Sequence, residues 1–335
     1  MVGAVRLDES RLLSRTGRSL LRDVPPFGLV QPRVGLIYNR RSHRNREREQ
    51  QLGPFRAPVD ARVPADESAV IDALRDFAAN GIDLLIVDGG DGTVRDVLSA
   101  ADQVFGADMP RIAVLPSGKT NALAIDLGIP VEWTVDDVIA AAVRGSGAVR
   151  SPVEVERSGQ EDARLRGFLI GAGAFVRATS LAQHPNRWGL FNGFAVGFSL
   201  TLALGRTFFG FSGNSWRRGE AMTLQFEDGS VLSGQRYLLL ASTLETLPLG
   251  VKPFGPTRPG LKLLSVDAPP RRMVAGVAAL LSGSTASWLE RLGYRRRDID
   301  CVAIDLPGGF ILDGEKFAGG RIVIRRGAPI RFVVP

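Results

Sequence analysis

The sequence predicts an α/β domain with a parallel sheet and crossover helices, followed by a mainly β, sandwich-like domain. Its 335 residues exceed one average domain and suffice for two cores. Between residues 33 and 145, apolar strand-type runs alternate with helix patterns. Beyond residue 150 the chain changes to short β-type runs separated by turn residues. We therefore assign residues 33–145 to the first domain and residues 146–335 to the second.

Residues 1–32 are interpreted as a basic extension in front of the first domain. A short amphipathic helix is expected around Ser10 to Leu21, ending before Pro25. Arginines are scattered through the segment, and it lacks the continuous apolar core of a secretory signal. A solvated tail therefore fits it better than a membrane anchor.

The first domain is expected to contain strands that alternate with helices. Residues Val70, Ile71, Leu74 and Phe77 recur at the three- and four-residue spacings of a helix that Asn80 and Gly81 then end. Parallel strands need crossover connections, so this alternation predicts a parallel sheet. The predicted strands are Val34–Tyr38, Ile82–Val87 and Arg111–Leu115, and the predicted helices are Ser68–Phe77, Thr93–Ala101 and Asn121–Leu127.

The second domain is expected to consist of many short strands, which is typical of a β-sandwich. Its last segment could pack back on the first domain. The predicted strands are Val153–Glu156, Leu165–Ile170, Ala221–Phe226, Arg236–Ala241, Leu261–Val266, Cys301–Leu306, Arg321–Arg325 and Ile330–Val334.

One stretch of the second domain, Gly189 to Gly205, contains no charged residue. It is short for a membrane span and is interrupted by glycines, which disfavours a transmembrane helix. A helix buried in the second domain is the simplest interpretation. The alternative is an apolar surface that admits a lipid chain or dips into a bilayer, with Trp188 and Arg206 at its ends.

The charge of the chain favours partners that carry phosphate. Its formal net charge is +7 and its sequence pI is near 10.2, and arginine supplies most of the positive side. Zinc-finger spacing, a basic region with heptads and aromatic ribonucleoprotein-type strands are all missing from the sequence, so nucleic acid is not an expected partner. Nucleotides and anionic lipid headgroups remain.

Cysteine and histidine usage points to a reducing compartment. The single cysteine, Cys301, excludes an intrachain disulfide, and His43 and His184 have no familiar zinc-site spacing with it. We therefore expect a cytoplasmic protein.

Two loops at strand ends are the candidate binding elements. Open parallel sheets bind ligands at the carboxyl ends of their strands, and glycines there let backbone N–H groups approach phosphate oxygens. Asp91 would repel phosphate directly, so we expect it to hold Mg2+ or a water network between itself and the phosphates. The first loop is Asp88, Gly89, Gly90, Asp91, Gly92, Thr93 and Val94, and the second is Ser117, Gly118, Lys119, Thr120 and Asn121.

These loops resemble those of the diacylglycerol kinase catalytic domain, which is shared by bacterial lipid kinases, sphingosine kinases and ceramide kinases. The match runs from about residue 33 to residue 335. It rests on Gly89–Thr93, on Pro116–Ala124 about one βα unit later, and on Asp313, Gly314 and Glu315 near the end of the chain. Without the resemblance, the last of these would be read as a hairpin turn.

The resemblance implies an ATP-dependent lipid kinase with the nucleotide in a cleft between the two domains. Asn39 would contact ATP, with Arg40 and Ser42 beside it, and both glycine loops would surround its phosphates. The implied general base toward the lipid hydroxyl is Glu315, with Asp91 as the second catalytic residue and Asp313 near metal or phosphate. Phosphoryl transfer depends mainly on positioning and on neutralising charge, which agrees with such a site.

The chain also departs from the family pattern. Relatives usually have a proline after the Asn39 position, often a threonine at the position of Lys119, and in diacylglycerol kinases an acid at that of Ala122. Many place an aspartate after the phenylalanine that corresponds to Phe175, and its absence here favours a neutral lipid with two chains, either ceramide or diacylglycerol.

Two other functions stay open at this point. NAD kinases also use a Gly-Gly-Asp-Gly loop, so a soluble acceptor is one alternative. A catalytically silent lipid-binding member of the fold is the other. The positive charge predicts peripheral contact with an anionic membrane surface at its cytoplasmic face, and a homodimer is a further possibility.

Overall fold

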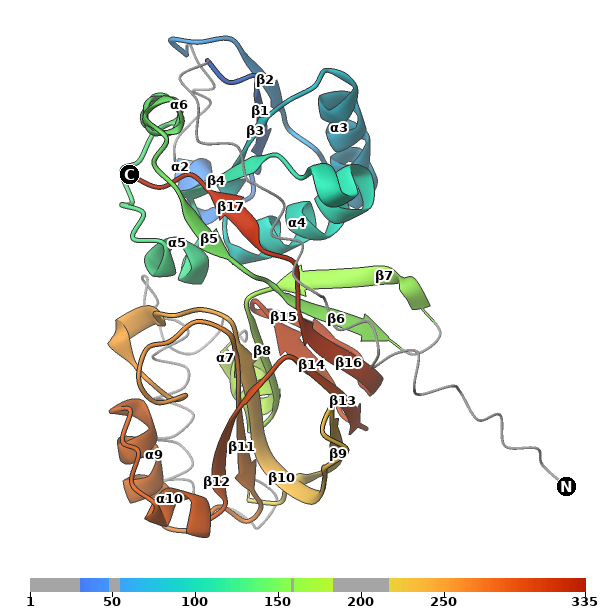
Figure 1. Ribbon diagram of the computed structural model, residues 1–335, viewed down its shortest axis with the longest axis vertical. Coiled ribbons are helices and arrows are strands. Elements are labelled where there is room, and N and C mark those ends of the chain that lie inside the picture. The colour runs from blue at the N-terminus through green and yellow to red at the C-terminus, as the bar shows by residue number, and fades with distance from the viewer. Residues whose placement is uncertain (1–30, 48–54, 158–159, 183–216) are drawn as a thin grey trace, which may run out of the picture.

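The computed structural model describes residues 31–47, 55–157, 160–182 and 217–335. A helix-bearing sheet and a larger antiparallel sheet are stacked along the long axis (Figure 1). The apolar stretch Gly189–Gly205 and nearly all of the predicted extension at residues 1–32 lie outside the described residues. Within those residues, no helix is both long enough and apolar enough to cross a membrane.

The N-terminal sheet has six strands in the described part of the chain, in the order β2-β1-β3-β4-β17-β5. Strands β1 to β4 and β17 are parallel, and β5 pairs antiparallel with β17 at one edge. The strands are β1 (Val34–Tyr38), β2 (Val59–Arg62), β3 (Leu84–Gly89), β4 (Arg111–Pro116), β5 (Ala148–Arg150) and β17 (Ile330–Phe332).

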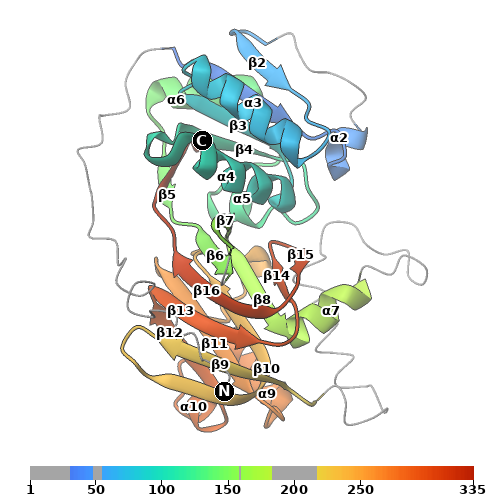
Figure 2. The same ribbon diagram turned by 90° about the vertical axis from the view of Figure 1, so that its right-hand side faces the viewer.

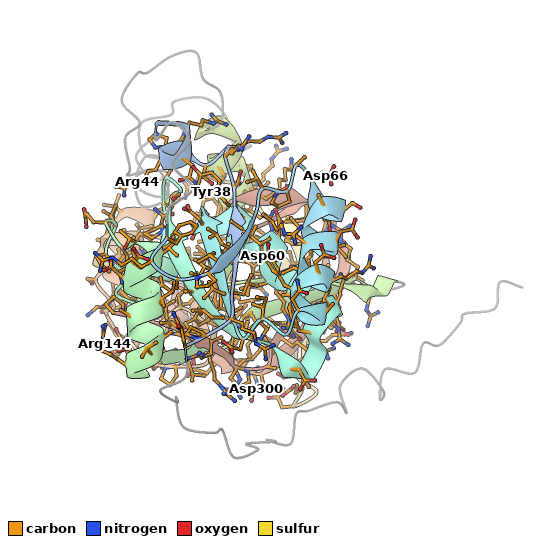
Figure 3. The ribbon with its side chains drawn as sticks, turned by 90° about the horizontal axis from the view of Figure 1, so that it is seen from above. Tyr38, Arg44, Asp60, Asp66, Arg144 and Asp300 are labelled. Atoms are coloured by element: carbon orange, nitrogen blue, oxygen red, sulfur yellow. The ribbon has the colours of Figure 1, made fainter. Side chains whose placement is uncertain are left out.

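Helices α3 and α4 cover one face of this sheet and α6 covers the other (Figure 3). Helix α3 packs Phe77 against Gly35 of β1, where a Cβ would lie 2.9 Å from the ring. It begins at Asp66, whose carboxylate accepts the N–H of Ala69 at 2.9 Å. The helices are α2 (His43–Glu47), α3 (Glu67–Ala79), α4 (Asp91–Phe105), α5 (Ala122–Asp126) and α6 (Val135–Arg144), with a 3-10 turn at Gly106–Asp108.

The order of the strands places a topological switch between β1 and β3. From β1 the chain first adds β2 on one side and then β3 and β4 on the other. Loops that leave the ends of β1 and β3 therefore diverge, which is where open α/β sheets bind ligands. Tyr38, the last residue of β1, and Arg44 of α2 lie on the same side of the domain in the view from above (Figure 3).

The C-terminal sheet is antiparallel and has eleven strands within the described residues. Its central strand β10 pairs with β9, β8 and β11. The strands are β6 (Val153–Arg157), β7 (Gln160–Gly167), β8 (Leu169–Gly173), β9 (Glu220–Phe226), β10 (Val231–Ser242), β11 (Leu261–Asp267), β12 (Tyr294–Ile299), β13 (Cys301–Leu306), β14 (Phe310–Leu312), β15 (Glu315–Phe317) and β16 (Gly320–Arg326).

Alternate residues of eight of these strands face one apolar core, so the sheet curves around it as in a sandwich. Leu224, Ile304 and Ile324 are fully buried examples from β9, β13 and β16. Three helices accompany this sheet in the described residues, together with a 3-10 turn at Pro248–Gly250. They are α7 (Ala174–Ala182), α9 (Met273–Leu281) and α10 (Trp288–Arg291).

The structure divides one predicted strand and contains further strands that the sequence did not predict, β12 among them. The strand predicted at Leu165–Ile170 is wrong, because the chain breaks between β7 and β8 at Phe168. The N–H of Phe168 turns to the carboxylate of Asp313, and its carbonyl accepts the Ser242 hydroxyl at 2.8 Å. Strand β12 was not predicted, because three consecutive arginines from residue 295 hide its alternation.

The chain passes between the two sheets twice, from β5 to β6 and from β16 to β17. Beside these crossings, the ring of Phe332 in β17 meets Phe168 edge to face, with centroids 6.2 Å apart. Helix α4 packs on β7, where the buried Arg166 pairs with Glu154 at 2.6 Å and Asp102 at 2.8 Å. The relative position of the sheets is thus held by both apolar and charged contacts.

Because the fully buried Phe332 fills the junction between the sheets, Phe332→Ala should lower the free energy of unfolding by about 3 kcal/mol. Urea denaturation followed by circular dichroism measures this loss. The matched control is Val149→Ala on the neighbouring strand β5, which should change stability by less than about 0.5 kcal/mol because the Val149 side chain is exposed. Equal losses in both variants would contradict the role of Phe332.

Candidate active site

Two glycine turns meet backbone to backbone at the carboxyl edge of the N-terminal sheet. A Cβ on Gly118 would lie 2.5 Å from the Cα of Gly90, and a Cβ on Gly90 would lie 2.9 Å from the Cα of Gly118. The N–H of Ser117 also donates to the carbonyl of Gly89 at 3.1 Å. No side chain fits between these turns, so their backbone groups alone form the surface here.

Asn39 ties the end of β1 to the start of α4 across the switch point. Its side-chain amide donates to the hydroxyl of Thr93 at 2.7 Å. Thr93 in turn packs on Gly89, where a Cβ would lie 2.5 Å from the Cβ of Thr93. The structure therefore brings three of the predicted nucleotide-binding residues together in one contact.

Asp88 supports both loops from beneath, since only 8% of it is exposed. Its carboxylate accepts the Ser117 hydroxyl at 2.5 Å and the side-chain amide of Asn45 at 2.9 Å. The same amide of Asn45 donates to the carbonyl of Asn39 at 2.9 Å. Asn45 was not identified from the sequence, because the arginine-rich run around it carried no signal for a buried polar residue.

Asn121 closes the second loop rather than capping helix α5 with its side chain. Its amide oxygen accepts the N–H of Gly118 at 2.8 Å, and its amide nitrogen donates to the Gly118 carbonyl at 3.0 Å. Asn121 has the left-handed conformation, with a φ of 52°, which asparagine tolerates better than most residues.

The carboxylate of Asp91 takes the position of the missing cap on α5. Backbone N–H groups of Asn121, Ala122 and Leu123 approach it and lower its pKa. Burial acts in the opposite direction and is the larger effect, so the pKa of Asp91 is raised to about 6. Asp91 thus joins the first glycine turn to the second.

Asp313 reaches the same place from the C-terminal sheet. It lies in the hairpin between β14 and β15, where Asp313 and Gly314 both have positive φ, 46° and 87°. Its carboxylate accepts the N–H groups of Phe168 and Leu169 at 2.9 to 3.1 Å. Burial first, and then the charge of Asp91, raise the pKa of Asp313 to about 7. The carboxylates of Asp91, on α4, and Asp313, on the hairpin of the other domain, therefore lie close enough to interact electrostatically.

Glu315, on the same hairpin, forms an ion pair with Arg95 of α4. Arg95 is almost fully buried, and its guanidinium also donates to the carbonyl of Leu312 at 3.2 Å and to Asp96 at 2.6 Å. The Glu315 side chain itself is more than half exposed. Arg95 was not predicted, since its partner lies far away in the sequence and only the fold brings them together.

The remaining predicted residues lie around this centre. Lys119 is exposed on the second glycine loop, and the segment between β1 and α2 carries the exposed Arg40 and the buried Ser42. Val94 belongs to the core of α4, so its side chain cannot contact a ligand. Gly92 and Thr120 are partly exposed.

A pocket of about 410 Å³ opens beside the second glycine turn, between α2 and α5. Both apolar and basic side chains line it. The volume lies in the range of small-molecule sites. The lining residues are His43, Arg44, Pro116, Gly118, Lys119, Thr120, Asn121, Ala124, Ile125, Ile129 and Val131.

No group of three or more acidic, histidine or cysteine side chains that could hold a metal ion occurs in the part of the chain that the structure describes. Asp91 and Asp313 form a pair only. Magnesium usually takes one or two protein carboxylates and completes its shell with water and phosphate oxygens. Two carboxylates that interact electrostatically and have raised pKa values therefore suit a cation that arrives together with a phosphate ligand.

Residues 33–150 match the diacylglycerol kinase catalytic domain family. Lipid kinase YegS of Escherichia coli strain K12 is 30% identical over 92 residues, which are 28% of this chain and 29% of that protein. Probable lipid kinase YegS of Escherichia coli O127:H6 is 28% identical over 99 residues, 30% of this chain and 32% of that protein. The chain thus spans less than a third of the length of these relatives.

Solved structures share the fold over nearly the whole chain. A diacylglycerol kinase from Bacillus anthracis superposes with a TM-score of 0.61 and 14% identity, over 91% of this chain and 97% of that one. A second structure from that organism has a TM-score of 0.64 at 16% identity and the same coverage. At these identities the likeness establishes the two-domain fold.

The raised pKa of Asp313 predicts how the stability of the metal-free protein depends on pH. Asp313 binds its proton more tightly when folded, because its pKa rises from 3.8 to about 7. The free energy of unfolding should therefore fall as the pH rises through this interval. Asp313→Asn removes this charge and keeps an acceptor oxygen and a residue suited to positive φ. Its melting temperature should exceed that of the wild type by a few degrees at about pH 8.

This difference should shrink at about pH 5, where the wild-type carboxyl is largely protonated. Calorimetry in the presence of a chelator measures both values. Asp72→Asn, at an exposed carboxylate of α3, is the control and should show no pH-dependent difference. If the difference in melting temperature between wild type and Asp313→Asn did not change with pH, the raised pKa of Asp313 would be contradicted.

Proposed function

Because residues 33–150 belong to the diacylglycerol kinase catalytic domain family, we propose that this protein transfers the γ-phosphoryl group of ATP to the hydroxyl of a membrane lipid. The observation that carries the proposal is the backbone contact between the two glycine turns, beside which the charges of Asp91 on α4 and Asp313 from the second domain interact. Phosphoryl transfer needs such a place, where phosphates, a cation and an acceptor come together.

The two turns would bind the phosphates through backbone N–H groups. Helix α4 begins at the first turn, so its N-terminus adds a favourable dipole for an anion. The pocket of about 410 Å³ continues from the second turn and is large enough for a nucleoside. Lys119 and Arg44, which line this pocket, supply positive charge for the phosphates.

Asp91 and Asp313 would hold a magnesium ion, because burial first and then the charge of Asp91 raise the pKa of Asp313, and a bound cation would favour the charged carboxylates. When bound, Mg2+ neutralises charge on the transferring phosphoryl group. The protein's part is to hold the two carboxylates. Backbone N–H groups of α5 orient Asp91, and those of Phe168 and Leu169 orient Asp313.

Glu315 is the proposed general base. Backbone N–H groups hold the carboxylate of Asp313 in place, whereas the Glu315 side chain is more than half exposed and accessible to an acceptor. Glu315 would take the proton of the lipid hydroxyl as that oxygen bonds to the γ-phosphorus. The bond from the γ-phosphorus to the bridging oxygen then breaks and leaves ADP. Arg95 holds Glu315 in place and balances the negative charge of the site.

We propose a neutral lipid with two chains, ceramide or diacylglycerol, as the acceptor. An amine-bearing lipid would require a free carboxylate near the start of α7, but Phe175 is followed there by Val176 and Arg177. Arg177 pairs with Glu220 at 3.1 Å, so this acid is already neutralised. Such an acceptor lies in a bilayer, and the net charge of +7 supports peripheral association with an anionic membrane surface at its cytoplasmic face.

Purified protein with Mg2+ and radiolabelled ATP should phosphorylate ceramide or diacylglycerol in mixed micelles, with no transfer to NAD. The assay presents a panel of lipids and NAD separately and measures labelled product. Transfer to NAD without detergent would replace the lipid acceptor by a soluble one. Binding to liposomes without any transfer would indicate a catalytically silent protein of this fold.

In the same assay, Asp91→Asn and Glu315→Gln should each lower kcat at least about 100-fold, since each removes a charge that acts in the transition state. Asp305→Asn is the matched control, because that carboxylate is exposed on β13 in the same domain as Glu315. It should retain full activity. Unchanged turnover in Asp91→Asn or Glu315→Gln would refute the assigned role of that residue.

A further inference from the structure

A second cavity, of about 510 Å³, lies in the C-terminal domain. The start of β10, the end of β11 and the turn from α10 into β12 form its walls. These segments lie at the end of the molecule that points away from the N-terminal sheet (Figures 1 and 2). The lining residues are Leu232, Ser233, Gly234, Gln235, Arg236, Asp267, Ala268, Pro269, Arg271, Arg291, Leu292, Gly293 and Arg295.

The charge of this cavity is strongly unbalanced. Four guanidinium groups line it, from Arg236, Arg271, Arg291 and Arg295, and Asp267 supplies the single carboxylate. Both oxygens of this carboxylate are engaged, one by Arg236 and the other by Arg295 at 2.5 Å. One negative charge is thus shared between Arg236 and Arg295, and Arg271 and Arg291 add two further positive charges.

Arg236 is built into the wall of the cavity. It is 4% exposed, donates to the carbonyl of Ser233 at 3.2 Å, and has an Nε without a hydrogen-bond partner. Burial lowers its pKa, and the charge of Arg295 lowers it further. A buried guanidinium is costly unless it is well paired, so the cavity keeps a charge that its own carboxylate compensates only in part.

Arg271, between β11 and α9, and Arg291, the last residue of α10, both line the cavity and are exposed. In the segments that the structure describes, neither side chain pairs with a carboxylate. Asp267, the one acid in the cavity, is held in place by a close backbone contact, since a Cβ on Gly293 would lie 2.6 Å from its carboxylate. Two guanidinium groups therefore remain for a ligand.

We propose that this cavity binds the phosphate group of an anionic ligand. Guanidinium groups form paired, charge-assisted hydrogen bonds to phosphate oxygens. The planar guanidinium of arginine suits this paired geometry better than the ammonium group of lysine does. A phosphate there would relieve the repulsion among the four arginines. Arg271 and Arg291 would bind it directly, with Arg236 and Arg295 supplying charge from the wall.

This site is separate from the proposed phosphoryl-transfer site. Strand β10 connects the two regions, with Arg236 at the cavity and Ser242 bonded to Phe168, next to Asp313. Six residues of extended strand span roughly 20 Å. This distance is far longer than the distance between reacting atoms in a phosphoryl transfer. The phosphate in this cavity is therefore an additional ligand, either free in solution or carried by a lipid headgroup.

Titration calorimetry at low salt, without nucleotide, tests the proposal with inorganic phosphate and glycerol 3-phosphate. The test variant is Arg271→Gln/Arg291→Gln, whose exposed side chains make no described ion pair. The control is Arg75→Gln/Arg326→Gln, which loses the same charge from exposed positions elsewhere. Phosphate affinity of the cavity should fall at least about tenfold in the test variant and stay unchanged in the control. Melting curves check that both variants fold.

A second arm uses sedimentation with vesicles of phosphatidylglycerol, and with phosphatidylcholine vesicles as reference. Loss of soluble phosphate binding in the test variant alone supports a site for free phosphate. Binding to phosphatidylglycerol alone, again lost only in the test variant, supports a site for a lipid headgroup. Equal behaviour of test and control variants in both arms would overturn the proposal. Neither arm measures phosphoryl transfer, so the outcome is independent of the proposed kinase activity.

Discussion

The whole candidate site depends on the contact between the backbones of Gly90 and Gly118. Two loops that follow different strands can touch only because neither residue has a side chain. This contact lets the carboxylate of Asp91 reach the first N–H groups of α5, and lets Ser117 reach the carboxylate of Asp88. The close approach of Gly90 and Gly118 thus positions both the backbone surface that would face the phosphates and the neighbouring carboxylate of Asp91.

Helix α4 connects the glycine turns to the second domain. Asp91, Arg95, Ser99 and Asp102 lie at intervals of three and four residues, so they share one face of the helix. The charge of Asp91 acts on Asp313, Arg95 pairs with Glu315, and Ser99 and Asp102 bind the backbone and the guanidinium of Arg166. A single helix face therefore positions the hairpin of β14 and β15 against the glycine turns.

The positive charge of the chain is used in two distinct ways. Arg95, Arg150 and Arg166 are paired inside the molecule and hold elements together. At the cavity beside β10 and β12, arginines outnumber acids, and the fold keeps them close although they repel. The same residue type is structural where a carboxylate meets it and available to an anion where none does.

The sequence by itself determined the two-domain class, the parallel order of the first domain and both glycine loops, because these depend on local periodicity and on residues adjacent in the chain. The segment around Phe168 could not be predicted from such local information. Its apolar run was interpreted as one strand, but the carboxylate of Asp313, 145 residues later, breaks it in two. Only the tertiary structure decided that Arg95 meets Glu315, that Asn45 supports Asp88, and that four scattered arginines line one cavity. These contacts join residues distant along the chain, and no local pattern encodes which of them become neighbours.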